Sequence, residues 1–435
     1  MKRLFYLSSM LALVTSISLA GKSYAAHQAK SAGALRSVRL CVSAPIGIPS
    51  NVHLVQGIYN GAILASTQQK ATFKKAGLNL LQPILKDYAK SDASGNDPNK
   101  ERQNALSCIA DNAVLGYDGT LNSSIALVSE PILNKAHMVM ISPSNTGVVL
   151  TAPSSRQAQE PDTYAHKIPW VTYYRVVTTD ALQGPADAVV MSKKLKIKTY
   201  FLIDDKQTYG AGLAAAMDKY ASSKLGMQKV GIGHIDPTDS STISTTADAV
   251  SDQVVSKNAD GVFYGGNLET GFTLAKDMRA KGYKKPLMGG DALVDARWIP
   301  NAGAGAVNDY ATSVGPDIQS AAKSFQTAYK RAFKSFLAGG GFGPYDALSY
   351  DAANIMLNAI LKAQKAGKLK GSITKQREAV VANVASTHYS GATGKGSFDK
   401  NGDTTNRIVS VYQVTGSAWK FVGTAPNVPG AKPTG

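Results

Sequence analysis

Strand-like apolar runs alternate with segments of helical period along most of this chain. The first series begins with the run 38–43, continues with an apolar stripe at helical spacing in 55–65, and leads to the run 138–141. A short continuous apolar run is typical of a strand buried on both faces, as in a parallel sheet whose strands are joined by helices. The alternation therefore predicts an α/β fold built on a doubly wound parallel sheet.

A second series of the same kind follows later in the sequence. Its runs lie at 199–203, 261–264 and 286–288, with helical periods between them. The chain has 435 residues, which is more than one hydrophobic core usually organises, so two domains are expected. The sequence thus predicts two α/β lobes with a cleft between them.

Polar residues flank a helix-and-strand pattern in residues 119–146. Asn122 and Ser123 stand where a helix would be capped, and Thr146 ends a polar segment that follows the run 138–141. Open α/β sheets bind ligands at the carboxyl ends of their strands, and free N–H groups at a helix start suit an anion. The pattern favours a carboxylate site made by Ser123 and Thr146. An ordinary helix cap followed by an ordinary turn is the alternative.

Two residues of the second series stand at equivalent positions. Tyr209 lies in the polar loop after the run 199–203, and Asp291 follows Gly289 and Gly290 after the run 286–288. Because glycines let the backbone approach closely, Asp291 is expected to project into the cleft and to hold an ammonium group. Tyr209 is expected to close on the ligand. The alternatives are that Tyr209 packs on its own lobe and that Asp291 caps the next helix.

The amino-terminal residues have the three parts of a secretory signal peptide. Two basic residues, an apolar run from Leu4 to Leu19 and a small-residue segment ending at Ala25 occur in that order. We expect cleavage after Ala25 and a free periplasmic or secreted protein, with an uncleaved membrane anchor as the alternative. In an oxidising compartment Cys41 and Cys108 could form a disulfide, but buried thiols are also compatible with their apolar surroundings.

Composition excludes some functional classes. Lys and Arg number 47 against 30 Asp and Glu, a formal net charge of +17. These basic residues are scattered and lack the interleaved aromatics of a nucleic-acid groove, so a solvated basic surface is expected. The six histidines show no metal-binding spacing, and no catalytic motif occurs. The sequence therefore predicts no enzyme, no metal, no cofactor and no nucleic-acid partner.

Seven motifs occur in the order of a known family. The chain resembles the type I periplasmic solute-binding proteins of ABC importers, in particular those for leucine, isoleucine and valine, over most of residues 36–423. The motifs that carry the resemblance are Asn60-Gly61-Ala62, the segment 141–146, Gln183-Gly184-Pro185, the segments 204–210, 262–266 and 287–291, and the segment 396–403.

The resemblance implies two Rossmann-like lobes joined by three crossings of the chain, near Val176, Thr312 and Gly394. The domains expected from it are a signal peptide at 1–25, a first lobe of 36–175 with 313–393, a second lobe of 176–312 with 394–423, and a disordered tail at 424–435.

The resemblance also implies a set of ligand-binding residues. Ser123 and Thr146 match the residues that hold the ligand carboxylate, while the Ser144 carbonyl, Thr146 and Asp291 match those that hold the ammonium. Tyr209 matches an aromatic that covers the ligand, and Tyr345 falls where the family has an aromatic contact. The sequence departs from the family near His53-Leu54 and near Asn267, where tyrosines are replaced, so the side-chain end of the pocket is not fixed by the resemblance.

By this resemblance the chain is the periplasmic binding subunit of an importer. It would capture an amino acid, branched-chain or similar, as a monomer and deliver it to ABC permease and ATPase subunits. A ligand sensor of the same fold and a binder of another small carboxylate or amide are the alternatives. The sequence does not separate these roles.

Overall fold

The computed structural model describes residues 35–49, 52–92, 95–152, 171–306, 308–338, 341–426 and 428. The expected signal peptide lies outside these residues. All that follows concerns the compact unit formed by residues 36–435. In its described part the strands form a six-stranded sheet, a seven-stranded sheet and a two-stranded hairpin.

The first sheet is parallel throughout and has the strand order β2-β1-β4-β5-β6, with β3 also paired to β1. Its central strand β4 is buried along its whole length, because helices cover both faces of the sheet. The strands are β1 Arg36–Ser43, β2 Leu78–Leu80, β3 Ile84–Lys86, β4 Val114–Gly119, β5 Met140–Ser142 and β6 Tyr173–Arg175.

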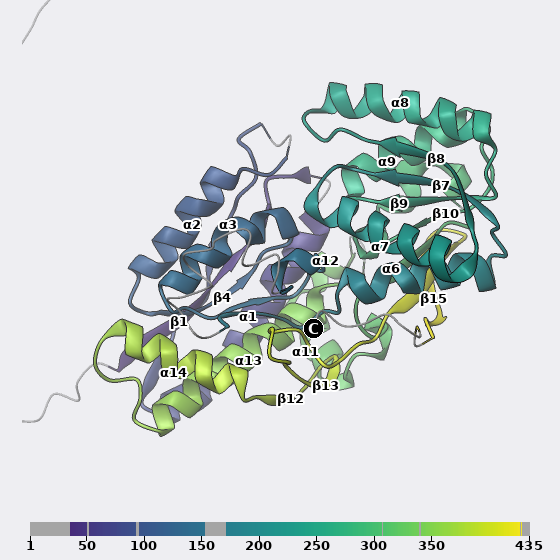
Figure 1. Ribbon diagram of the computed structural model, residues 1–435. Helices are drawn as coiled ribbons and strands as arrows, with labels where there is room; N and C mark the ends of the chain where they lie inside the picture. The colour runs from purple at the N-terminus through teal and green to yellow at the C-terminus, as the bar shows by residue number, and fades with distance from the viewer. Residues whose placement is uncertain are drawn as a thin grey trace, which may run out of the picture. The chain divides into compact units, whose positions relative to one another are not determined.

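Two groups of helices cover the first sheet (Figure 1). On one face α1 (Val52–Lys75), α13 (Asp346–Lys365) and α14 (Ile373–Ala385) bury a large aliphatic core. On the other face α2 (Pro98–Ala110) and α3 (Ser123–Lys135) bury a smaller one. We call this sheet and its helices the first lobe.

The second sheet has the order β15-β14-β11-β10-β9-β7-β8. Strands β7 to β11 are parallel, and β14 and β15 add an antiparallel edge. The strands are β7 Thr199–Asp204, β8 Gln228–His234, β9 Gly261–Gly265, β10 Leu287–Gly289, β11 Tyr310–Ser313, β14 Ser410–Thr415 and β15 Ala418–Thr424.

Helices again cover both faces of the second sheet. The helices are α6 Asp180–Val189, followed by a π-helical segment Val190–Lys194, α7 Thr208–Leu225, α8 Ser240–Lys257, α9 Leu268–Ala280 and α10 Trp298–Ala302. One core packs α6 and α7, and another packs α8, α9 and α10. We call this sheet and its helices the second lobe. The predicted α/β class with parallel-dominated sheets is confirmed.

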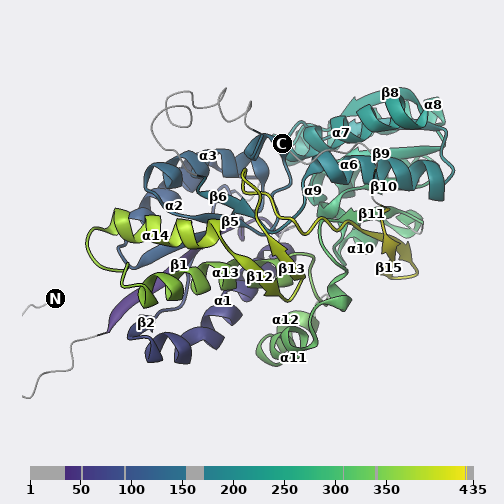
Figure 2. The ribbon, with the colours of Figure 1, turned by 60° about the horizontal axis from the view of Figure 1, so that its bottom comes forward.

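The remaining elements belong with the first lobe. Helices α11 (Lys323–Ala332) and α12 (Lys334–Ala338) precede α13, and a hairpin of β12 (His388–Gly391) and β13 (Gly394–Ser397) lies beside α13 (Figure 2). Among the described residues, no helix combines the length and the apolar character that a membrane span needs.

We propose that these two lobes are the predicted domains, with two changes to their bounds. Phe398 packs in the first-lobe core, and Asp403 forms a β-bridge with Arg175 of β6. The third crossing therefore follows Asp403 and does not lie near Gly394. The expected disordered tail was also set too early, because β15 continues to Thr424 and the Ala425 N–H donates to Val409. Residues 429–435 lie outside the described part.

The two cysteines, whose state the sequence left open, are joined. Cys41 of β1 and Cys108 of α2 form a disulfide in the smaller core of the first lobe, and both residues are fully buried. The bond closes a loop between positions that are 67 residues apart.

We predict that removing this bond destabilises the protein. In the chain-entropy model a loop of this length gives about 4 kcal/mol, because the crosslink restricts the unfolded chain. Denaturant unfolding should therefore shift to lower denaturant when a reductant is added. The Cys41→Ala/Cys108→Ala double variant should unfold like the reduced wild type and should not respond to reductant. Equal stability with and without reductant would contradict the prediction.

Candidate functional site

The carboxyl ends of strands from both lobes converge on one cavity. Segments that follow β4 and β5 meet segments that follow β7, β9 and β10, as expected for ligand sites of open α/β sheets. The volume open to the centre of a water molecule is about 20 Å³, which is close to the space of one water. A larger ligand therefore enters only when the lobes or the lining side chains move apart. The lining residues are Leu54, Leu121, Asn122, Ser123, Ser144, Tyr209, Asn267, Leu268, Asp291, Ala292 and Tyr345.

The amino terminus of α3 supplies the positive end of the cavity. Ser123 is the first residue of this helix and is 1% exposed. The first N–H groups of a helix have no partner within the helix and carry its positive dipole end. The Ser123 hydroxyl accepts from the Gly147 N–H at 3.2 Å, which leaves its own proton available for a ligand oxygen.

Asn122 precedes α3 but does not cap it with its side chain. Its Oδ1 accepts from the Tyr88 hydroxyl at 3.0 Å, and its Nδ2 lies 3.4 Å from Oδ1 of Asn267 in the second lobe. The sequence predicted a cap here. The side chain instead joins the two lobes, because the strand ends place Asn267 opposite it.

Ser144 and Thr146 follow β5 and differ in position. Ser144 lines the cavity, and its hydroxyl donates to Thr120 O at 2.9 Å. Thr146 is buried but does not line the cavity, and its carbonyl accepts from the Asp180 N–H at 3.0 Å. Five of the six predicted residues thus line the cavity, whereas Thr146 is buried next to Ser144 and Asn145 without being one of the lining residues.

Asp291 is the charged group of the cavity wall. Its carboxylate accepts from the Tyr209 hydroxyl at 2.9 Å, from Gln183 Nε2 at 3.0 Å and from the Tyr345 hydroxyl at 2.6 Å. Tyr209 and Gln183 belong to the second lobe, whereas Tyr345 precedes α13 of the first. The carboxylate therefore bridges the lobes and does not serve as a helix cap.

Gly290 makes this cluster possible. A Cβ at this position would lie 2.4 Å from the Tyr209 hydroxyl oxygen and 3.2 Å from Gln183 Nε2. Real Cβ atoms essentially never make a contact as short as the first, and the second is tighter than most, so a larger residue would displace the Tyr209 hydroxyl and crowd Gln183.

Further buried carboxyl groups lie behind Asp291. Asp187 accepts from the Thr312 hydroxyl at 2.7 Å, and Thr312 in turn accepts from Gln183. Burial and the charge of Asp291 raise the pKa of Asp180 to about 8, and burial also raises the pKa values of Asp187 and Asp291. Their common cause is that charge is costly away from water. This side of the cavity favours a cation.

Sequence reasoning missed several residues of the site. Gln183 was noted only as part of a motif, although its position in the first turns of a helix after a strand could have indicated a role. Leu54, Leu121, Leu268 and Ala292 form the apolar part of the wall. They carry no local signal, because an apolar residue in a loop or first turn looks the same in a core as in a pocket.

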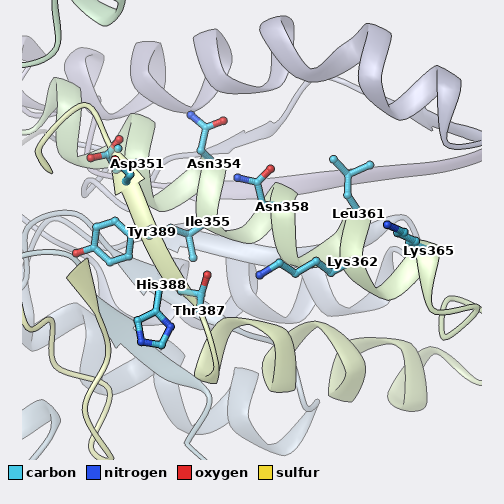
Figure 3. Close-up of a pocket in the computed structure, with 12 residues that line it drawn as sticks. Asp351, Asn354, Ile355, Asn358, Leu361, Lys362, Lys365, Thr387, His388 and Tyr389 are labelled. Carbon is cyan, nitrogen blue, oxygen red and sulfur yellow. The ribbon is translucent and has the colours of Figure 1, made fainter. Parts of the chain in front are cut away.

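A second cavity lies on the first lobe, between α13 and β12, with about 390 Å³ open to water centres (Figure 3). Asn354, Asn358 and Lys362 of α13 stand opposite the Thr387–Tyr389 segment. Its carboxylate, Asp351, already accepts from the N–H groups of Ala392 and Thr393 at 2.7 and 2.8 Å. Among the described residues that line it, no buried side-chain nitrogen or oxygen lacks a partner. The cavity between the lobes is therefore the candidate site.

Two doubly wound lobes with a polar cavity between their strand ends define a two-lobed ligand-binding protein. The family model described as periplasmic binding protein matches residues 88–418. The chain belongs to this family.

Known proteins similar to the chain agree with this assignment. A Leu/Ile/Val-binding protein homolog from Brucella melitensis is 24% identical over 234 residues, which are 54% of this chain and 56% of that protein. The chain thus matches little more than half the length of this relative. The solved leucine-binding protein LivK of Thermotoga maritima has a TM-score of 0.72 at 22% identity, covering 89% of this chain and 98% of that one. A solute-binding protein of R. palustris in complex with benzoate has a TM-score of 0.68 at 18% identity, covering 89% and 96%.

The buried carboxyl groups predict a pH dependence of stability. Burial raises the pKa of Asp180 to about 8 and those of Glu269, Asp309 and Asp346 to about 7. A carboxyl whose pKa is raised in the folded state stabilises the fold fully at pH values below its unfolded-state pKa near 4. This stabilisation is lost as the pH rises through the folded-state pKa. The thermal midpoint should therefore be higher at pH 5 than at pH 8.5.

Asp180→Asn is the matched variant for this prediction. It cannot ionise, so it should narrow the stability difference between the two pH values by about 1 kcal/mol or more. Calorimetric unfolding at both pH values checks this. A midpoint that is equal or higher at pH 8.5 would refute the prediction.

Proposed function

We propose that this protein is the periplasmic substrate-binding subunit of an ABC importer and that it captures an amino acid by closure of its lobes. The observation that carries the proposal is the pairing of opposite electrostatic ends across one cavity. The amino terminus of α3 lies on one side and the Asp291 carboxylate on the other. A zwitterion carries matching charges at its two ends.

Each lining residue then has a role. Ser123 and the N–H groups at the start of α3 bind the ligand carboxylate. Asp291 and the Ser144 carbonyl bind the ammonium, and Tyr209 and Tyr345 cover it from opposite lobes. Thr146 supports Asp180 from behind the cavity and does not reach the ligand.

The rest of the wall fits an aliphatic side chain. Leu54 and Leu121 come from the first lobe, and Leu268 and Ala292 come from the second. Burial of a Val- or Leu-sized side chain against such a wall contributes about 1.5–3 kcal/mol. This composition supports a branched-chain or similar amino acid, in line with the names of the Brucella and Thermotoga relatives.

Binding and release follow from contacts with both lobes. A ligand that touches Ser123 in one lobe and Asp291 in the other favours the closed arrangement over the open one. Permease and ATPase partners would recognise that arrangement. The proposed periplasmic location, reached through a cleaved signal peptide, accords with the Cys41–Cys108 disulfide, because such bonds persist in oxidising compartments.

The benzoate complex of the R. palustris neighbour motivates a second candidate, the binding of a small carboxylate without an amino group. The amino terminus of α3 could bind the carboxylate of either kind of ligand. Only the Asp291 side of the cavity therefore distinguishes an amino acid from a carboxylate without an amino group. A ligand sensor of the same fold would bind the same ligands and would differ in its partner.

We predict that Asp291→Asn weakens amino acid binding steeply. Leaving the ammonium without a charged partner in a closed cavity costs about 3–5 kcal/mol. Titration calorimetry with amino acids, amides and small carboxylates on wild type and variant checks this, and thermal unfolding confirms that the variant is folded. Unchanged amino acid affinity, or ligands that all lack an amino group, would remove the amino acid assignment and leave the binding fold.

We also predict that alanine substitutions at Ser123 and at Thr146 have different effects on ligand affinity. Ser123→Ala removes a donor that lines the cavity, so affinity should fall at least tenfold, or about 1.4 kcal/mol. Thr146→Ala is the matched control, and it should change affinity less than threefold because Thr146 is not among the residues that line the cavity. Equal losses in both variants would place Thr146 in direct contact with the ligand after all.

A further inference from the structure

A second set of contacts joins the lobes outside the cavity. His53 lies at the start of α1 and is 9% exposed. Its Nδ1 is 3.2 Å from Oδ2 of Asp295 in the second lobe, and its Nε2 is 3.2 Å from the Gly341 carbonyl. Both partners are acceptors, so both ring nitrogens must carry a proton. Only the imidazolium form of histidine meets this requirement.

Asp295 is held rigidly in the second lobe. Arg297 donates Nε to Oδ1 at 2.7 Å and Nη2 to Oδ2 at 2.8 Å, a two-point clamp on a fully buried carboxylate. The Trp419 indole N–H donates to the Asp295 carbonyl at 3.0 Å. The acceptor for His53 therefore has a fixed position.

Arg297 also reaches the first lobe. Its Nη1 donates to the Pro49 carbonyl at 3.0 Å. His53 of the first lobe thus bonds to Asp295 of the second, and Arg297 of the second lobe donates to Pro49 of the first. None of these four residues lines the cavity, although Leu54, the neighbour of His53, does.

We propose that His53, Asp295 and Arg297 form a latch that holds the lobes closed without touching the ligand, and that the latch engages when His53 is protonated. This inference rests on the proposed closure around a ligand. The three residues are positioning residues, because they act on affinity only through the arrangement of the lobes.

The groups around His53 favour its charged form. Asp295 and Arg297 face it from the second lobe, and Asp346 faces it from the start of α13. The ring also stacks on Phe336 of α12, with centroids 4.8 Å apart and planes inclined by 19°. Burial and the charge of Arg297 lower the pKa of His53, but the hydrogen bond and charge of Asp295 and the charge of Asp346 outweigh them, so the pKa is raised overall.

Asp295 keeps its charge over the relevant pH range. Although burial alone would raise its pKa, the bonds from Arg297 and His53 lower it to about 2. Burial raises the pKa of Asp346 to about 7. Asp346 belongs to the same lobe as His53 and remains beside it when the lobes separate, so its titration affects the open and closed arrangements alike.

The direction of the pH effect follows. Opening the lobes removes Asp295 from His53, so the ring binds its proton more tightly in the closed arrangement than in the open one. Protonation therefore favours closure. Ligand affinity should be highest below about pH 6.5, the ordinary histidine value, and should fall as pH rises through the raised pKa of the closed form.

The first experiment compares ligand affinity at pH 5.5 and 8.5 for wild type, His53→Gln and Asp295→Asn, by titration calorimetry with the best amino acid. Wild-type affinity should fall at least threefold between the two pH values. His53→Gln should bind more weakly than wild type at pH 5.5 and should lose this fall. Because Asp291 titrates in wild type and in every variant, the difference between their pH profiles reports the effect of His53. His388→Gln, at an exposed histidine of β12, is the matched control and should keep the wild-type profile.

The second experiment needs no ligand. Small-angle scattering of the ligand-free protein should give a smaller radius of gyration at pH 5.5 than at pH 8.5 for wild type, and a smaller difference between the two values for His53→Gln. His53→Asn serves as a second variant if the first unfolds. If wild type binds no amino acid but shows this compaction, the proposed function fails and the latch stands. If His53→Gln keeps the wild-type pH profile in both experiments, or if wild type shows no pH effect in either, the latch is wrong.

Discussion

A carboxylate buried between two lobes is the interaction on which the rest of the arrangement depends. Asp291 is 2% exposed and is met by three neutral donors rather than by a cation. Neutral donors satisfy its oxygens but do not cancel its charge, and an unpaired buried charge costs several kcal/mol. Tyr345 reaches Asp291 from the first lobe, and Gln183 bonds to both Asp291 and Thr312. In the proposed function, a ligand ammonium would supply the charge that these donors lack.

The same network continues into the crossings between the lobes. Gln183 bonds both to Asp291 and to Thr312 at the end of β11, where the chain leaves the second lobe. Nearby, the fully buried Arg175 donates to Asp403 at 2.6 Å and to the carbonyls of Asn145 and Gly147. Arg175 thus ties the first crossing to the third and to the segment after β5 that forms the cavity wall. The residues around the cavity are therefore bonded to the segments that we propose join the two lobes.

Two contacts between the lobes differ in what would strengthen or weaken them. The Tyr345–Asp291 bond lies in the cavity wall, where the proposed ligand would contact it. The His53–Asp295 pair lies outside the wall and responds to protons. Because both contacts act on the same closure, their free energies add to one equilibrium between open and closed arrangements. A chain with this design can bind the same solute with different affinity at different pH without any change in the ligand contacts.

The sequence predicted the α/β class, the two lobes and five residues that line the cavity, of which Ser144 and Tyr345 came only from the family resemblance. The fold class and several site residues follow from local sequence patterns. Apolar runs form buried strands, and the residues just after those runs lie at the strand ends. Ser123, Tyr209 and Asp291 could therefore be found from their positions relative to these runs. Only the tertiary structure decided which side chains meet across the lobes. Thr146 is buried but is not among the lining residues, Asn122 bonds to Asn267 rather than to its own helix, and Cys41 forms a disulfide with Cys108, 67 positions away. His53 and Asp295 are 242 positions apart and have no pattern in common. Their pairing depends on the packing of two separate cores, which fixes distances between elements that no local pattern encodes.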